Sequence, residues 1–171
     1  MGHTGKVVIV TGAGRGIGRC VAASYAAEGA RVVIAERDRS TGEVAESSIR
    51  EMGGEASFIM TDISVPDQVA AMVRATVEKY GTIDIVINNA GFGIWKSPLD
   101  LTIEEWDSVV NTNLRGAFLC AREAARFMKE HGGGSVVNIA STRAFMSEAG
   151  SEAYAASKGG VVALTHALAA S

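Results

Sequence analysis

A tyrosine and a lysine, Tyr154 and Lys158, stand four residues apart near the end of a chain of 171 residues. On a helix this spacing puts both side chains on one face. An ammonium beside a phenol favours the phenolate, so such a tyrosine can exchange a proton with an alcohol or a carbonyl. Ser141 follows a predicted strand, at the strand end where open α/β sheets bind ligands, and its hydroxyl can hold a substrate oxygen against Tyr154. The pair alone is weak evidence, because most pairs with this spacing are surface contacts.

A glycine-rich segment, Thr11-Gly-Ala-Gly-Arg-Gly-Ile-Gly18, follows a predicted strand and opens a predicted helix. Bare backbone N–H groups and the positive end of a helix dipole suit a phosphate group. Gly12, Gly16 and Gly18 are placed to allow a sharp turn, close approach of a pyrophosphate and close packing of helix on strand. The strand before and the helix after indicate a dinucleotide-binding turn rather than a simple tight turn.

Glu36 ends the second predicted strand, 18 residues after Gly18. An acid at this position can accept both hydrogen bonds from an adenosine ribose, and it repels a 2′-phosphate, which favours NAD. Arg37 and Arg15 can pair with that phosphate and favour NADP, although Arg37 is equally interpretable as a solvated charge. We expect NAD, with NADP as the alternative. Asp62 is a candidate acceptor for the adenine amino group; otherwise it caps the next helix, a position for which Ser64 is better suited.

Short apolar runs alternate with helical patterns along the whole chain. The predicted strands cover residues 7–10, 31–35, 56–60, 83–87 and 135–140. The predicted helices cover residues 17–28, 41–52, 66–80 and 103–131, the last interrupted near 111–115, and a final helix begins between 151 and 154 and is still running at 171. Strands alternating with helices through short connections predict one α/β domain, a doubly wound parallel sheet with helices on both faces.

The composition fits a globular protein and excludes several classes of partner. The net charge of -3 offers no broad basic surface, so we expect no nucleic acid as partner. No apolar run reaches the roughly 18 residues that cross a membrane, and the N-terminus does not resemble a signal peptide, so we expect a cytoplasmic protein. Cys20 and Cys120 fit small buried residues, and we expect no metal site.

These motifs together resemble the short-chain dehydrogenase/reductase family over all 171 residues. The resemblance rests on the glycine turn, Asn88-Asn-Ala-Gly91, Asn113, Ser141 and Tyr154-Ala-Ala-Ser-Lys158. It implies a Rossmann-like sheet of strand order 3-2-1-4-5. It also implies an oxidoreductase that transfers a hydride between NAD(P) and a secondary alcohol or ketone.

The resemblance also assigns roles within the catalytic site. It makes Tyr154 the general acid/base and Ser141 the residue that orients the substrate oxygen, and it implies that Lys158 also binds the nicotinamide ribose. Asn113 would interrupt its helix and hold a water in a proton relay to Lys158, and Asn88 would brace the sheet. The expected nucleotide site comprises Gly12, Arg15, Gly16, Ile17, Gly18, Glu36, Arg37, Asp62, Ile63, Asn89, Ala90, Gly91, Tyr154 and Lys158.

Members of the family usually continue for roughly another third, with two more strands and a helical lid over the substrate. We therefore expect a domain that is incomplete at its C-terminus, with the fifth strand at the edge of the sheet. Without the lid the chain would bind dinucleotide weakly and turn over slowly or not at all. The alternative function is a dinucleotide-binding module without catalysis; a methyltransferase would leave Tyr154, Lys158 and Ser141 unused.

Clues to the substrate and the assembly are fewer. Arg143 is a candidate for recognising an acidic or polyhydroxy substrate. Alternatively, it forms an ion pair with Glu148 or Glu152. Trp95 is a candidate pocket wall, or else a core or interface residue; the other candidates for the wall are Phe92, Phe145 and Met146.

The two long helices carry more apolar residues than one sheet can cover, and the family often pairs them, so we expect a homodimer or homotetramer. The apolar residues are Phe118, Phe127, Met128, Val161, Leu164 and Leu168.

Overall fold

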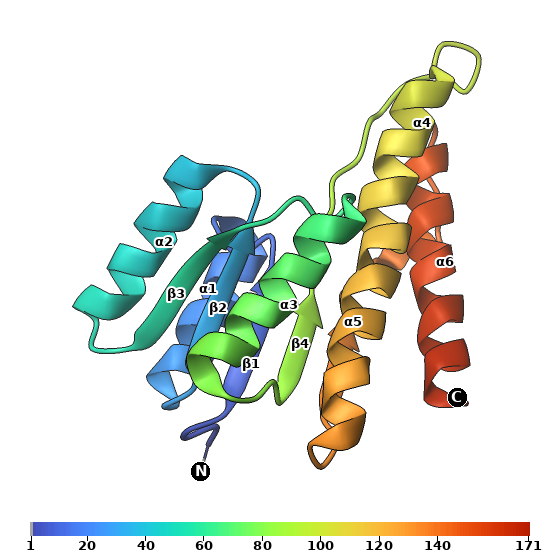
Figure 1. The fold of residues 1–171 in the computed structure, drawn as a ribbon. Coiled ribbons are helices and arrows are strands. Elements are labelled where there is room, and N and C mark those ends of the chain that lie inside the picture. The colour runs from blue at the N-terminus through green and yellow to red at the C-terminus, as the bar shows by residue number, and fades with distance from the viewer. Residues whose placement is uncertain (1) are drawn as a thin grey trace.

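A five-stranded parallel sheet forms the centre of the computed structural model, which describes residues 2–171 (Figure 1). Its strands are β1 (Val7–Thr11), β2 (Arg31–Glu36), β3 (Glu55–Met60), β4 (Ile85–Asn88) and β5 (Ser135–Asn138). They lie in the order β3-β2-β1-β4-β5, and every neighbouring pair is parallel. The predicted fold class and strand order are therefore confirmed, with β5 at one edge of the described sheet.

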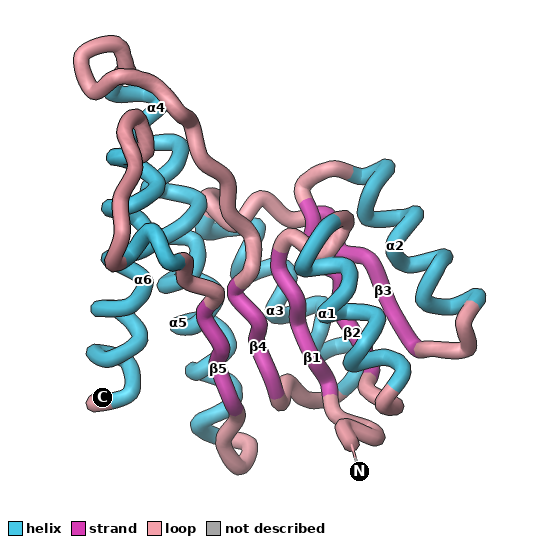
Figure 2. Tube along the Cα trace, turned by 180° about the vertical axis from the view of Figure 1, so that it is seen from behind, coloured by secondary structure: helices cyan, strands magenta, loops and turns pink. Residues whose placement is uncertain are grey.

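Helices cover both faces of this sheet. They are α1 (Gly16–Ala27), α2 (Arg39–Glu51), α3 (Pro66–Tyr80), α4 (Ile103–Val110), α5 (Gly116–Glu130) and α6 (Glu152–Ala169). The helices α1 and α2 pack on one face, which is turned toward the viewer in Figure 2, and α3 and α5 pack on the other. Helix α6 lies beside α4, next to the edge of the sheet formed by β5 (Figure 1).

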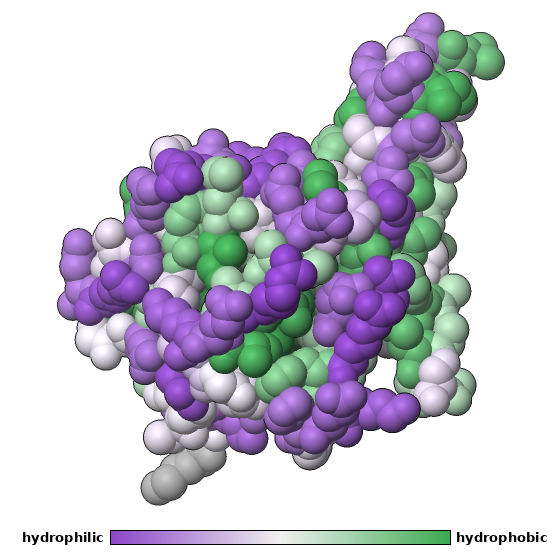
Figure 3. Space-filling model, viewed as in Figure 1, coloured by the Kyte–Doolittle hydropathy of each residue, from purple (hydrophilic) through white to green (hydrophobic). Residues whose placement is uncertain are grey.

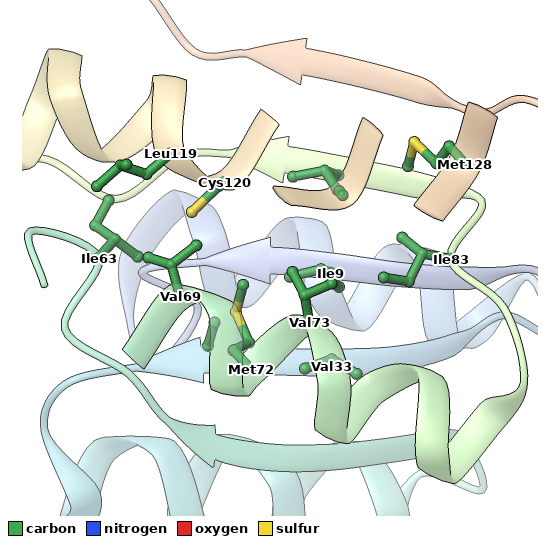
Figure 4. Packing of buried hydrophobic residues seen from close by; sticks show 13 residues of the cluster. Ile9, Val33, Ile63, Val69, Met72, Val73, Ile83, Leu119, Cys120 and Met128 are labelled. Atoms are coloured by element: carbon green, nitrogen blue, oxygen red, sulfur yellow. The ribbon is translucent and has the colours of Figure 1, made fainter. Parts of the chain in front are cut away.

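The core is split by the sheet into two hydrophobic clusters. Side chains alternate along β1, so that Ile9 faces the cluster with α3 and α5 while Val8 and Val10 face the cluster with α1 and α2. Figure 4 shows Ile9 and Met72 in the first of these clusters. All five residues of β1 are fully buried, and burial of each large aliphatic side chain contributes about 1.5–3 kcal/mol. The end of β1 is thus a fixed support for the glycine turn that follows.

One helix start and one helix cap differ from the sequence-based expectation because of local hydrogen bonds. Helix α2 begins at Arg39 instead of residue 41, since the carboxylate of Asp38 accepts a hydrogen bond from the backbone N–H of Thr41 at 2.8 Å and caps the helix. The prediction that Ser64 caps α3 was wrong. Val65 takes that position, and the Ser64 hydroxyl donates instead to the carboxylate of Asp62 at 2.6 Å.

The two cysteines have different environments. Cys120 is buried in the core, where loss of hydration raises the pKa of its thiol to about 12. The prediction that Cys20 is also buried was wrong, because its side chain is exposed. The buried face of α1 is formed by Gly18, Ala22 and Ala26, which recur every four residues, and Cys20 lies between these positions.

The apolar surface of the two long helices is smaller than the sequence suggested. Met128 and Val161 were expected to need a partner, but both are buried within the chain's own structure. Phe118 remains 37% exposed, and Figure 3 shows hydrophobic atoms along the side where α6 lies. None of the helices within residues 2–171 combines the length and the apolar character that a membrane crossing requires.

Candidate functional site

A cleft of about 470 Å³ opens where the strands of the sheet end at their carboxyl side. Every residue of the expected nucleotide site lines this cleft, and so does Ser141. The structure thus brings together residues that lie up to 146 positions apart, from Gly12 to Lys158. Sequence reasoning did not single out five further lining residues, which are Ala35, Thr61, Thr112, Ile139 and Ala140.

The glycine turn packs so closely against its neighbours that side chains at Gly12 and Gly18 would not fit. Gly12 has a φ of +64°, and a Cβ there would lie 2.7 Å from Cα of Ala90. A Cβ on Gly18 would lie only 2.3 Å from the carbonyl oxygen of Gly12. Within residues 2–171 no side chain caps the start of α1, and its first turn carries no acid. The first N–H groups of α1 and its positive dipole end therefore suit the pyrophosphate of a dinucleotide.

The carboxylate of Glu36 is fixed beside this turn by backbone N–H groups. One oxygen accepts from Gly14 at 3.2 Å, and the other accepts from Arg37 at 2.9 Å and from Asp38 at 3.2 Å. The guanidinium of Arg37 lies 5.7 Å from the ring centroid of Phe92, across the same cleft. The acid is thus held in the cleft, while Arg37 contacts an aromatic ring.

The loop after β3 presents Asp62 and Ile63 to the cleft. The carboxylate of Asp62 accepts from the backbone N–H of Ser64 at 2.9 Å as well as from its hydroxyl. The backbone N–H of Asp62 donates to the side-chain amide oxygen of Gln68 at 2.7 Å. Ile63 lines the cleft although its side chain belongs to the core cluster against α3 and α5. This loop is accordingly held in one conformation by both a polar turn and a buried anchor.

The loop after β4 is tied to β1 by Thr11 and Asn89. The hydroxyl of Thr11 accepts hydrogen bonds from the backbone N–H groups of Asn89 and Ala90, both at 3.0 Å. The side-chain amide of Asn89 donates to the carbonyls of Thr11 at 2.9 Å and of Gly12 at 3.2 Å. Thr11, the first residue of the glycine-rich segment, thus bridges β1 and the loop after β4, a role that the sequence did not indicate.

Asn113 sits in a π-helical turn, Asn111–Arg115, which confirms the predicted interruption between α4 and α5. Its carbonyl oxygen accepts from the backbone N–H of Phe92 at 3.0 Å, and its amide donates to Phe92 at 2.8 Å and to Ser157 at 3.0 Å. A Cβ on Gly91 would lie 3.0 Å from the Asn113 side chain and 3.6 Å from Nζ of Lys158. Asn113 therefore joins the loop after β4 to α6, close to Lys158.

Lys158 is buried beneath the cleft wall, with only 4% of its surface exposed. Its Nζ donates to the carbonyl of Ile139 at 2.6 Å and lies 5.8 Å from the ring centroid of Tyr154. Burial lowers the pKa of this ammonium. Tyr154 is half-buried on the same helix, so the helical spacing read from the sequence does put both groups at the cleft.

Ser141 lies between β5 and a short 3-10 turn, Thr142–Ala144. Its hydroxyl oxygen accepts from the backbone N–H of Arg143 at 3.1 Å, which fixes the side chain while its own proton remains available to a ligand. Ser141 and Tyr154 both line the cleft, as the proton-transfer site requires.

The two candidate substrate residues lie beside the cleft and meet at Glu148. The guanidinium of Arg143 pairs with the Glu148 carboxylate, one of the alternatives left open by the sequence. The indole N–H of Trp95 donates to the other oxygen of Glu148 at 2.9 Å. The Trp95 ring lies 5.6 Å from that of Tyr154 between centroids. Residues 2–171 contain no group of three or more His, Cys, Asp or Glu that could hold a metal ion.

Comparisons with known proteins agree with this geometry. An uncharacterized oxidoreductase from Thermotoga maritima is 48% identical over 167 residues, which are 98% of this chain and 65% of that protein. A metagenomic short-chain oxidoreductase in complex with NADP shares 36% identity at a TM-score of 0.92, covering 96% of this chain and 75% of that one. An NAD⁺-bound xylitol dehydrogenase shares 34% identity at a TM-score of 0.93, covering 96% and 64% respectively.

The chain spans 65%, 63% and 59% of the length of three curated relatives that it matches. Residues 6–171 match the family model described as short chain dehydrogenase. With the glycine turn, the sheet order and Tyr154 beside Lys158 all in place, the chain belongs to the short-chain dehydrogenase family.

Proposed function

We propose that this chain carries the nucleotide-binding and proton-transfer residues of an oxidoreductase that moves a hydride between NAD(P) and a secondary alcohol or ketone. One observation carries the proposal. Tyr154, Lys158 and Ser141 line the same cleft as a glycine turn whose open N–H groups suit a pyrophosphate. Family membership supports the same reaction class.

The proposed roles follow from the positions of the side chains. The Tyr154 hydroxyl gives a proton to the substrate oxygen during reduction and takes it back during oxidation. Ser141 donates a hydrogen bond to that oxygen, since its own oxygen is already an acceptor for Arg143. The Lys158 ammonium, whose Nζ lies 5.8 Å from the ring centroid of Tyr154, is assigned to the nicotinamide ribose of the cofactor, as the family resemblance implies. A bound nicotinamide cofactor supplies or accepts the hydride, and the protein contributes orientation and proton transfer.

We propose NAD as the preferred cofactor. The carboxylate of Glu36 is fixed in the cleft by three backbone N–H groups, where it can accept hydrogen bonds from ribose hydroxyls and would repel a 2′-phosphate. Arg37 argues for NADP, but its guanidinium lies over the ring of Phe92, 5.7 Å from the centroid. Of the two relatives described with a cofactor, one holds NAD⁺ and the other NADP, so they do not decide between the two.

The test is titration of the purified chain with NAD⁺ and with NADP⁺ by calorimetry, followed by assay of Tyr154→Phe. The proposal expects NAD⁺ to bind more tightly than NADP⁺, and it expects Tyr154→Phe to abolish any NADH that a panel of secondary alcohols yields with the unaltered chain. Failure of both nucleotides to bind would overturn it.

The second candidate is a dinucleotide-binding module without turnover. It is favoured by the open substrate side, where Trp95 beside Tyr154 is 54% exposed in the described structure and water can reach the reacting groups. Cofactor binding without any NADH from the alcohol panel would select this candidate.

We also propose that two copies of the chain pair through α5 and α6, where Phe118 on α5 is exposed and Leu164 and Leu168 on α6 are partly exposed. A monomeric mass by light scattering at micromolar concentration would contradict this pairing.

A further inference from the structure

Glu148 links two loops that flank the substrate side of the cleft. Its carboxylate accepts from the indole of Trp95 through one oxygen and from the guanidinium of Arg143 through the other. Trp95 belongs to the loop after β4 and Arg143 to the segment after β5; both are traced in Figure 2. A backbone hydrogen bond from Lys96 to Gly150, at 3.1 Å, joins the same two loops again. Glu148 thus occupies a junction built from several contacts.

The contacts of Glu148 hold the Trp95 ring in a defined place. The ring lies back over Gly93, where a Cβ would come within 2.3 Å of the indole. The ring also neighbours Tyr154, at 5.6 Å between centroids and an interplanar angle of 33°. The backbone of Glu148 is fixed as well, since its carbonyl accepts from the Ser151 hydroxyl at 2.6 Å, at the start of α6. Trp95 therefore forms a wall next to the proposed acid/base.

The same contacts remove a free positive charge from the substrate side. Arg143 is the cation nearest in sequence to Ser141, and its charge is balanced by Glu148. The charged residues that line the cleft belong to the nucleotide side, apart from Lys158, which is buried and donates to Ile139. Apart from the hydroxyls of Thr112, Ser141 and Tyr154, the uncharged lining near Lys158 includes the apolar Ile139 and Ala140, and the exposed Trp95 ring lies beside Tyr154.

We propose that Glu148 is a positioning and specificity residue: it fixes Trp95 beside Tyr154 and neutralises Arg143, so that the site takes an uncharged, apolar ketone or secondary alcohol in preference to a carboxylate-bearing one. This inference rests on the proposed function, because it names the substrate class of the same cleft. Of the two interpretations that the sequence left open for Arg143, it favours the ion pair with Glu148 over contact with an acidic or polyhydroxy substrate.

The test compares two ketones of the same shape, cyclohexanone and 4-oxocyclohexanecarboxylate. Both are titrated in the presence of saturating NAD⁺, which cannot reduce them, so binding is measured without turnover. The signal is the fluorescence of Trp95, made the sole indole by Trp106→Phe, since the chain has two tryptophans. The unaltered site is expected to bind cyclohexanone about tenfold more tightly than the carboxylate, because a carboxylate that enters the site without a cationic partner loses hydration uncompensated.

The matched variant is Glu148→Gln, which keeps an acceptor for the Trp95 indole and frees the charge of Arg143. It is expected to bind the carboxylate about tenfold more tightly than before, with cyclohexanone little changed. Adding Arg143→Met to Glu148→Gln is expected to cancel that gain. Glu148→Ala, which also loses the indole acceptor, is expected to shift the emission of Trp95, whereas Glu148→Gln is not.

Three results would overturn the proposal. The first is tighter binding of the carboxylate by the unaltered site, and the second is an unchanged carboxylate affinity in a Glu148→Gln variant whose circular dichroism is native. The third is a Trp95 signal that responds to neither ketone. Titration of NAD⁺ alone separates these results from failure of the proposed function, because NAD⁺ still binds when only the substrate class is wrong.

Discussion

Asn88 and Asn138 stand directly opposite each other in the β4–β5 ladder, and the amide of Asn88 donates to the side-chain oxygen of Asn138 at 2.8 Å. The same amide donates to the carbonyl of Ala117 at 3.1 Å, on α5. Asn138 in turn donates to the hydroxyl of Thr165 at 2.9 Å, on α6. This chain of polar contacts fixes the two strands from which the catalytic loops leave, and it fastens the helix that carries Tyr154 and Lys158.

Replacement of Asn138 by alanine is therefore expected to lower the free energy of unfolding by about 1–3 kcal/mol. The variant leaves the buried Asn88 without one of its partners and frees Thr165, and an unsatisfied buried polar group costs about this much. Urea denaturation measures the loss, and Ser135→Ala, at an exposed position of the same strand, is the control. Equal free energies of unfolding of the two variants would show that these side-chain hydrogen bonds do not stabilise the fold.

Gly18→Ala is expected to weaken NAD⁺ binding by more than about tenfold, because its Cβ would lie 2.3 Å from the carbonyl oxygen of Gly12 and force the turn open. Calorimetric titration gives the affinity. Gly159→Ala is the matched control: it is a helical glycine whose nearest neighbour beyond its own helix lies 4.0 Å from the added Cβ. That variant is expected to bind NAD⁺ normally and to be about 0.4–1 kcal/mol more stable. Normal binding by Gly18→Ala would contradict the assigned role of the turn.

Local signals explain how much of the fold and the site was predictable. The β-branched runs and the glycines that punctuate them predicted the five strands, and the motif order predicted the cleft. The interruption at Asn111–Arg115 was also visible, because a polar segment breaks an otherwise helical pattern there. These features depend on neighbours in sequence, so a single sequence contains them.

What could not be predicted depends on contacts between distant residues. Trp95 and Glu148 are 53 positions apart and Asn88 and Asn138 are 50 apart, so no local pattern marks either pair. The exposure of Cys20 depends on which face of α1 meets the sheet. The hydroxyl of Ser64 had two possible partners, the helix start and Asp62, and geometry alone selects the second.

Glu36→Gln is expected to reduce the preference for NAD⁺ over NADP⁺ by about tenfold, because it removes the charge that repels a 2′-phosphate while keeping the side chain's size. Competitive titration of the two nucleotides measures the ratio. Glu43→Gln, an exposed acid on α2, corrects for the loss of one negative charge from the whole protein. A ratio that is the same in both variants would mean that Glu36 does not select the cofactor.

Lys158→Met is expected to raise the free energy of unfolding at neutral pH, with a gain that shrinks as the pH rises. Burial lowers the pKa of Lys158, so the folded protein holds this proton less tightly than the unfolded chain does. Below the lowered pKa the folded state bears the full cost of a buried ammonium. Between that pKa and the ordinary value of 10.5 the cost is relieved, so the stability contributed by Lys158 rises with pH through this window.

Urea unfolding of the native chain and of Lys158→Met, at steps from neutral pH to 10.5, measures this difference. The exposed Lys129→Met corrects for the loss of a positive charge. A gain that stays constant or grows with pH would contradict a lowered pKa.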